Sequence, residues 1–176
     1  LPEKEFIKLN ASNWQEYVLN GNFLRGESFV ELGKFAEASA AYEAISNSPA
    51  NDDLTQTYKL LAKIRIAKAS ALAGNGADSI KTLEEIIKVE NAENALVFSY
   101  AYNSLGAVYL AQSNFKEAMM AFLHTDLLYT NERDAHAEAL YYLTQIWPKL
   151  DQNERANQSR ESLKRYRNSV WTLRLQ

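Results

Sequence analysis

The residues of this chain that could do chemistry are few. It has two histidines, His124 and His136, and no cysteine. Without cysteine there is no thiolate nucleophile, no disulfide and no zinc–thiolate site. Asp134 and Glu138 flank His136 at i−2 and i+2, and residues at these spacings do not share a helical face. We therefore expect both histidines to be solvated or interface residues rather than metal ligands.

Catalytic motifs are equally scarce. The glycine-rich segment Gly74-Asn75-Gly76 lacks the lysine of a phosphate-binding loop, and we interpret it as a turn that ends a helix. The adjacent carboxylates Glu84 and Glu85 are typical of a solvated helix face. Together these observations predict a non-catalytic protein with no cofactor and no metal.

Composition indicates one folded domain. The chain has 176 residues, of which 47% are apolar, and glycine and proline are sparse, as in helical proteins. Its net charge of −3 is too small to suggest nucleic acid as a partner. The charge is uneven, because the segment from Lys149 onward carries about +4 and the rest about −7.

Membrane and targeting signals are not recognised. No window of the sequence is apolar for long enough to span a bilayer, and no signal peptide is present. The chain begins at Leu1-Pro2 without a methionine, so we expect that a leader or another domain has been removed. The composition fits the cytoplasm as well as the periplasm or cell envelope.

The element that must organise the chain is the stretch from Tyr102 to Phe122. Its apolar and small residues recur at helical spacing on both sides of a break at Ser113-Asn114. Small residues at Gly106 and Ala118 let two helices approach closely, and large side chains fill the space around them. This pattern predicts a helical hairpin.

The hairpin resembles a tetratricopeptide repeat (TPR) of the bacterial type. The residues that carry the resemblance are Tyr102, Leu105, Gly106, Tyr109, Phe115, Ala118 and Phe122. The same spacing recurs earlier in the chain, at Gly26, Phe29, Phe35, Ala38 and Tyr42. The resemblance implies an all-α, right-handed solenoid whose function is protein binding.

Equivalent small positions define four hairpins. Gly26, Ala67, Gly106 and Thr144 lie 41, 39 and 38 residues apart, whereas a tetratricopeptide repeat has about 34 residues. Because the spacing inside each hairpin is that of the shorter repeat, we expect elongated first helices. We place the hairpins at about 12–48, 51–90, 92–130 and 131–168 of a single domain at 12–168. Residues 1–11 are expected to form an extended lead-in and residues 169–176 an apolar tail.

The resemblance also implies a binding groove. In this family the first helix of each hairpin lines the concave side, where an extended peptide or a helix binds. The residues that we expect to bind a partner are Phe23, Glu27, Ile64, Lys68, Tyr100, Asn103, Tyr141 and Gln145. The remaining mapped positions are Asn20, Val30, Leu61, Leu72, Ala107, Leu110 and Glu138. The implied function is a scaffold or adaptor with a protein or peptide partner.

The C-terminal segment suggests alternatives. Its basic and apolar residues predict a surface that binds an acidic partner or a second copy of the chain. The residues of this predicted surface are Arg160, Lys164, Arg167, Trp171 and Leu173. The apolar tail either folds back, meets a further repeat or binds another chain. The ending Leu163, Tyr166, Ser169, Trp171 also resembles junctions in cell-envelope repeat proteins. A homo-oligomeric structural subunit and a cell-envelope assembly factor therefore remain alternatives.

Overall fold

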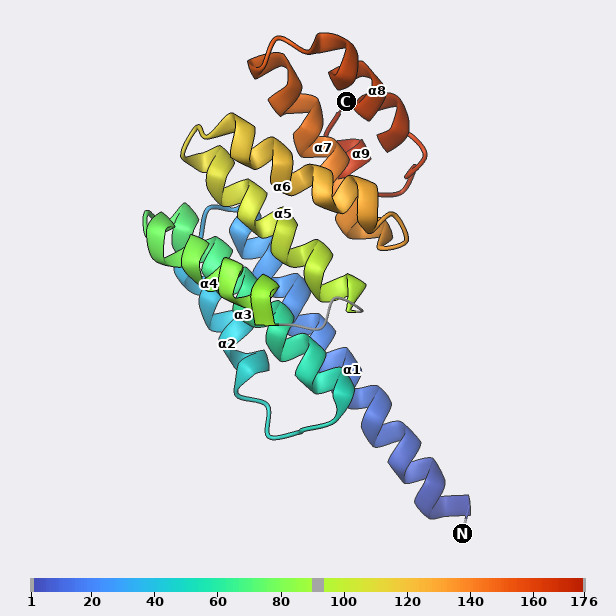
Figure 1. Ribbon diagram of the computed structural model, residues 1–176. Helices are drawn as coiled ribbons and strands as arrows, with labels where there is room; N and C mark the ends of the chain where they lie inside the picture. The colour runs from blue at the N-terminus through green and yellow to red at the C-terminus, as the bar shows by residue number, and fades with distance from the viewer. Residues whose placement is uncertain (1, 90–93, 176) are drawn as a thin grey trace.

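The computed structural model describes the backbone of residues 2–89 and 94–175 and the side chains of residues 14–88 and 94–175. This part of the chain is all-α and contains no strand (Figure 1). The helices are α1 (Pro2–Glu31), α2 (Phe35–Ser46), α3 (Asp53–Leu72), α4 (Gly76–Val89), α5 (Ala95–Ala111), α6 (Phe115–Leu128), α7 (Arg133–Lys149), α8 (Asn153–Leu163) and α9 (Val170–Leu173).

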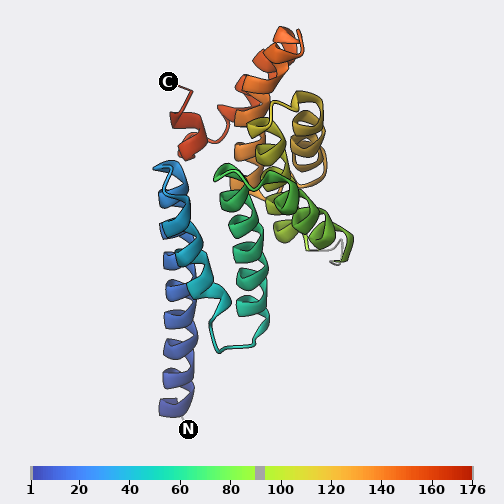
Figure 2. The ribbon, with the colours of Figure 1, turned by 90° about the vertical axis from the view of Figure 1, so that its left-hand side faces the viewer.

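The helices pack mainly against their neighbours in sequence. Each of α1 to α7 contacts the next helix, and α1, α3, α5 and α7 also contact one another in succession. The chain thus runs back and forth while the helices accumulate along one direction, and the N-terminal part of α1 projects beyond the others (Figures 1 and 2). This order brings α1, α3, α5 and α7 onto one side, where the site described below lies.

Local signals explain several helix ends. The Asp52 side chain caps α3 by accepting a hydrogen bond from the Thr55 backbone N–H at 2.9 Å. Asn94 caps α5 in the same way through the Val97 N–H at 3.2 Å. Gly33 and Gly74 follow α1 and α3 with φ of 69° and 114°, a left-handed conformation that glycine adopts without steric strain.

Two glycines allow the closest helix contacts, as their spacing predicts. A Cβ atom at Gly26 would overlap the Tyr42 ring, and one at Gly106 would lie 2.7 Å from the Phe122 ring. Both rings are fully buried. The glycines therefore leave the volume that the aromatic rings of α2 and α6 occupy.

Replacing Gly26 or Gly106 by alanine is expected to lower the free energy of unfolding by about 1–3 kcal/mol, because the ring beneath cannot move away in a filled core. Gly21 supplies the matched control, since it lies in α1 and a Cβ atom added there would have no neighbour within 4 Å. Gly21→Ala is expected to stabilise the helix by up to about 1 kcal/mol. Urea unfolding followed by circular dichroism measures all three. Equal effects at Gly21 and Gly106 would contradict the close-contact explanation.

The N-terminal end of the chain differs from the sequence-based expectation, whereas the C-terminal end follows one of the alternatives. The sequence predicts an extended lead-in over residues 1–11, but the chain is helical from Pro2. The helix α1 therefore begins ten residues before the expected start at residue 12. The apolar tail expected at 169–176 folds back onto α7, which is one of the alternatives left open, and contains the short helix α9. The Ser169 side chain caps this helix at the Trp171 N–H. The hairpin limits expected at residues 90 and 92 lie outside the described residues.

The buried apolar residues lie between the helices. One cluster runs from α1 to α6, a second joins α5 to α8, and a third holds the tail against α7. Alanine is frequent where helices meet, as at Ala38, Ala62, Ala101 and Ala118, all of which are fully buried. In the described part of the chain, we find no helix with the length and apolar character needed to cross a bilayer.

Candidate functional site

The main candidate site is a cleft between α1, α7 and the C-terminal segment, with a volume of about 540 Å³. We call it the α1–α7 cleft. Arg65 of α3 and Tyr100 of α5 also reach it, so four long helices contribute to its walls. Its lining residues are Phe23, Leu24, Glu27, Ser28, Glu31, Arg65, Tyr100, Asp134, Glu138, Asn168, Ser169, Val170, Trp171 and Arg174. The lining combines aromatic surface with both signs of charge.

A buried ion cluster lies beside the cleft. Arg65 and Lys68 stand one helical turn apart on α3 and both contact Glu138 of α7. The Arg65 Nη2 and Lys68 Nζ atoms lie 3.2 Å and 2.9 Å from the two carboxylate oxygens of Glu138. The side chains of all three residues are at most 5% exposed. The cluster therefore connects α3 to α7 through charges that water hardly reaches.

Further polar groups extend this cluster to α1, α2 and α5. The Nε of Arg65 lies 3.0 Å from Glu27 of α1, as an ion-pair contact rather than an aligned hydrogen bond. The Tyr42 hydroxyl donates to the same Glu27 carboxylate at 2.6 Å. Asn103 of α5 donates to Glu138 at 3.2 Å, and the Arg65 guanidinium lies 4.6 Å from the centre of the Tyr100 ring. Five helices, α1, α2, α3, α5 and α7, thus contribute to one charged centre.

The cluster keeps its charges at neutral pH. Burial disfavours the Glu138 carboxylate, but Arg65 and Lys68 outweigh it and lower the pKa of Glu138 from 4.5 to about 2. Burial likewise opposes the charged forms of Arg65 and Lys68, yet Glu138 raises the pKa of both above the ordinary value. None of these groups is poised to exchange a proton near pH 7, as a general acid or base would be.

The C-terminal segment closes one end of the cleft. Trp171 of α9 is buried, with its ring centre 5.3 Å from that of Tyr141 and 5.6 Å from that of Tyr142, both on α7. Arg174 lies over the Trp171 ring at 4.5 Å and pairs with Glu31 at the end of α1. Figure 2 shows α9 beside the end of α1. The tail folds back and joins the last long helix to the first.

The eight predicted groove residues divide into three groups. Phe23, Glu27 and Tyr100 line the cleft, while Lys68 and Asn103 lie buried beneath it. Of the remaining three, Ile64 is fully buried in the core, Tyr141 packs beneath Trp171, and Gln145 is exposed and does not line the cleft. Five of the eight therefore belong to one locality.

The residues predicted for an assembly or acidic-partner surface do not share one place. Trp171 is packed against α7, whereas Leu173 is 58% exposed. Lys164 is exposed, directly follows α8 and pairs with Glu161 of that helix, and Arg160 contacts Asn157. Arg167 lines a separate small cavity near the start of α7.

Sequence reasoning missed Arg65, and it left open whether the tail folds back onto the protein. The groove position that we mapped from the repeat pattern is Ile64. Arg65 is the following residue, so the mapping did not select it. A signal was present, because Arg65 and Lys68 interrupt a strongly apolar run and Glu138 interrupts another, which favours a buried ion pair. The packing of the tail onto α7 has no such local signal.

The histidines occupy structural positions. The two ring nitrogens of His136 lie 2.8 Å from Asp126 and 2.5 Å from the Tyr166 hydroxyl. The His124 ring stacks on that of Tyr102 at 4.4 Å between centres. Among the side chains that the structure describes, we find no group of three potential ligands arranged to hold a metal ion.

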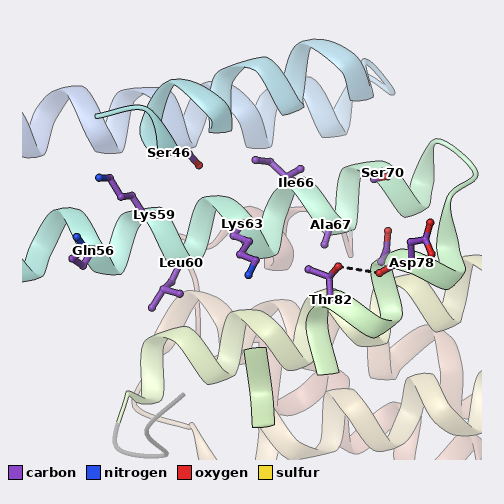
Figure 3. A pocket seen from close by; sticks show the side chains of 11 residues that line it. Ser46, Gln56, Lys59, Leu60, Lys63, Ile66, Ala67, Ser70, Asp78 and Thr82 are labelled. Carbon is purple, nitrogen blue, oxygen red and sulfur yellow. Dashed lines mark hydrogen bonds between the residues drawn. The ribbon is translucent and has the colours of Figure 1, made fainter. Parts of the chain in front are cut away.

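A second cavity, of about 470 Å³, lies between α3 and α4 (Figure 3). Leu60, Ile66 and Ala67 form its apolar surface, and the lysines Lys59 and Lys63 lie along α3 beside it. Lys59 donates to the Ala50 carbonyl at 3.2 Å. No ionised residue that lines this cavity is fully buried, so it offers less preorganised chemistry than the α1–α7 cleft.

Comparison of the chain with protein-family models, with curated proteins and with solved structures gave no significant match.

Proposed function

We propose that the protein is a non-catalytic scaffold or adaptor, and that the α1–α7 cleft binds an extended peptide or a helix of a partner protein. We further propose that its helices form a right-handed solenoid of four TPR-like hairpins. One observation carries both proposals. The long helices that line the cleft are α1, α3, α5 and α7, which are the first helices of the four proposed hairpins.

The chemistry of the cleft supports peptide binding. Leu24 is 57% exposed, and Phe23 and Tyr100 present aromatic surface beside it. Apolar and aromatic anchors surrounded by polar groups are typical of protein-recognition sites. The ion cluster and its hydrogen-bond partners link five helices, so binding need not order the cleft itself, and less free energy is lost on association.

A non-catalytic role is supported by the titration of the buried groups. The charge of Glu138 is balanced by those of Arg65 and Lys68. Their attraction lowers the pKa of Glu138 and raises the pKa of both cations, so all three groups stay charged. The chain contains no cysteine. The residues near the cleft therefore supply charge and shape rather than an activated nucleophile or a proton-transfer group.

The cleft proposal predicts a loss of partner binding when the cleft is filled. Ser28 is exposed and lines the cleft, so Ser28→Arg introduces a bulky side chain there without disturbing the core. Asn20 is exposed on the same helix but does not line the cleft, so Asn20→Arg makes the same change of charge elsewhere. Affinity purification from the natural host, quantified by mass spectrometry, is expected to recover the partner with the native and Asn20→Arg baits, and at least about tenfold less with Ser28→Arg.

The fold of each bait is checked by its thermal unfolding. Partners recovered equally with all three baits would contradict the cleft as the binding site. A partner lost with both variants would place the site elsewhere on α1.

A second candidate function is self-assembly through the outer face of α1. Trp14 and Tyr17 are 71% and 72% exposed there, and Gly21 between them and Leu24 has open space in front of it. Exposed apolar side chains on one helical face are typical of an interface. Recovery of copies of the chain itself as the only enriched protein, with every bait, would favour this alternative over the cleft.

A further inference from the structure

A small polar cavity of about 320 Å³ lies between the start of α7 and the segment that follows α8. We call it the arginine pocket. It is lined by Arg133, Asp134, Arg165, Tyr166, Arg167, Asn168 and Ser169. Three of these seven residues are arginines, while one is acidic, so the pocket carries a net positive charge in a chain whose overall charge is −3.

The three arginines have no carboxylate partner among the side chains that the structure describes. Arg65 and Arg174, by contrast, are both within ion-pair distance of a glutamate. The planar guanidinium group binds carboxylate oxygens through paired N–H donors. Arg133, Arg165 and Arg167 therefore retain their capacity to bind anionic oxygens.

The wall of the pocket is held in place. The Tyr166 hydroxyl hydrogen-bonds to His136 at 2.5 Å, and the other ring nitrogen of His136 lies 2.8 Å from Asp126 of α6. Arg133 lies over the Tyr166 ring at 5.3 Å from its centre. The chain of contacts from α6 through α7 to Tyr166 thus positions one of the three arginines before any ligand binds.

We propose that the arginine pocket binds carboxylate side chains of an acidic peptide segment. Asp134, Asn168 and Ser169 line both this pocket and the α1–α7 cleft, so the two cavities adjoin. A partner that crosses the cleft can place acidic residues among the three guanidinium groups. Only this last connection rests on the proposed function, because the pocket itself can be tested without a cleft partner.

An acidic peptide fits better than a nucleic acid or an anionic membrane. The positive charge is confined to a small hollow, whereas the chain before Lys149 carries about −7 and repels an extended polyanion. Binding to nucleic acid relies on many phosphate contacts spread over a long basic surface. A few carboxylates on a short segment match the size of the pocket.

The test uses the full chain and a fluorescein-labelled hexaglutamate peptide, with binding followed by fluorescence anisotropy at low salt. The pocket variant carries Arg133→Gln, Arg165→Gln and Arg167→Gln. The matched control carries Lys149→Gln, Arg160→Gln and Lys164→Gln, which remove the same charge from residues outside the pocket. We expect hexaglutamate to bind at least about tenfold more weakly to the pocket variant, and within about threefold of native to the control.

Three outcomes would overturn the proposal: no binding of hexaglutamate to the native chain, equal weakening in the two variants, or a pocket variant that binds as the native chain does. Vesicles of phosphatidylserine and phosphatidylcholine provide a further arm. Binding of these vesicles that is lost in the pocket variant, without loss of hexaglutamate binding, would assign the pocket to membranes instead.

The experiment also separates the two proposals. Ser28→Arg fills the cleft but leaves the arginine pocket intact, so this variant is expected to keep native affinity for hexaglutamate. Loss of hexaglutamate binding in Ser28→Arg would contradict a separate pocket. The cleft proposal is tested separately, by the affinity purification of the partner from the host, and the hexaglutamate result does not bear on it.

Discussion

Replacing Glu138 by glutamine is expected to lower the free energy of unfolding by about 3–5 kcal/mol. The substitution keeps the size of the side chain but leaves the positive charge of Lys68 buried without an ion-pair partner, and it leaves Arg65 with Glu27 alone. Both cations are at most 5% exposed, so solvent cannot compensate for the loss. Urea unfolding, followed by circular dichroism, measures the change.

Two further variants show whether the loss comes from the broken pairing. Glu43→Gln removes a carboxylate from an exposed position of α2 and is expected to change stability by less than about 0.5 kcal/mol. A triple variant with Arg65→Met, Lys68→Met and Glu138→Leu replaces the cluster by apolar side chains. The variant removes both buried cations together with their carboxylate, and the Glu27 carboxylate that loses Arg65 is 28% exposed. It is therefore expected to recover most of the stability lost in Glu138→Gln. A Glu138→Gln variant as stable as Glu43→Gln would contradict the role of the cluster.

Close helix contacts could be predicted from the sequence because their signals are local. The small residue at Gly106 and the aromatic residue at Phe122 recur with the same spacing at Gly26 and Tyr42, and the structure places each ring against its glycine. Such features depend on residues within one hairpin, where spacing alone determines which side chains meet.

The ion cluster and the closure of the cleft could not be predicted in the same way. Arg65 and Glu138 are 73 residues apart, and their contact depends on how successive helices pack. The tail behaves similarly, since the position of Trp171 against α7 depends on the turns that precede it in the chain. The residues of these segments indicate that each needs a contact within the protein, either a counter-charge or an apolar surface. They do not indicate which residue provides it.

The N-terminal part of α1 illustrates a different limit. A capping residue at Ser12 followed by Gln15 is typical of a helix start and predicts an extended segment before it. The structure instead continues the helix through Ser12, and Gln15 donates hydrogen bonds to Asp52 and Thr55 at the start of α3. A polar side chain that resembles a local cap can thus be used for a tertiary contact.

The folded protein is expected to lose stability as the pH falls from about 4.5 to about 2, through Glu138. Its carboxylate binds a proton with a pKa of about 2 in the folded state and near 4.5 in the unfolded chain. Below pH 4.5 the unfolded state therefore binds the proton more readily, and protonation favours unfolding. The contribution is fully present above this range and amounts to about 3 kcal/mol, because one pKa unit corresponds to about 1.4 kcal/mol.

The measurement is a series of urea unfolding curves between about pH 7 and about pH 2, for the native chain and for the triple apolar variant of the cluster. Asp52, whose pKa is lowered to about 2 by hydrogen bonds from the Thr55 backbone and from Gln15, remains in both proteins, so its effect cancels in the comparison. We expect the native curve to fall more steeply below pH 4.5 than that of the triple variant. Parallel curves would mean that protonation of Glu138 does not drive acid unfolding, because the variant lacks this carboxylate and its two cations while keeping every other acidic group of the chain.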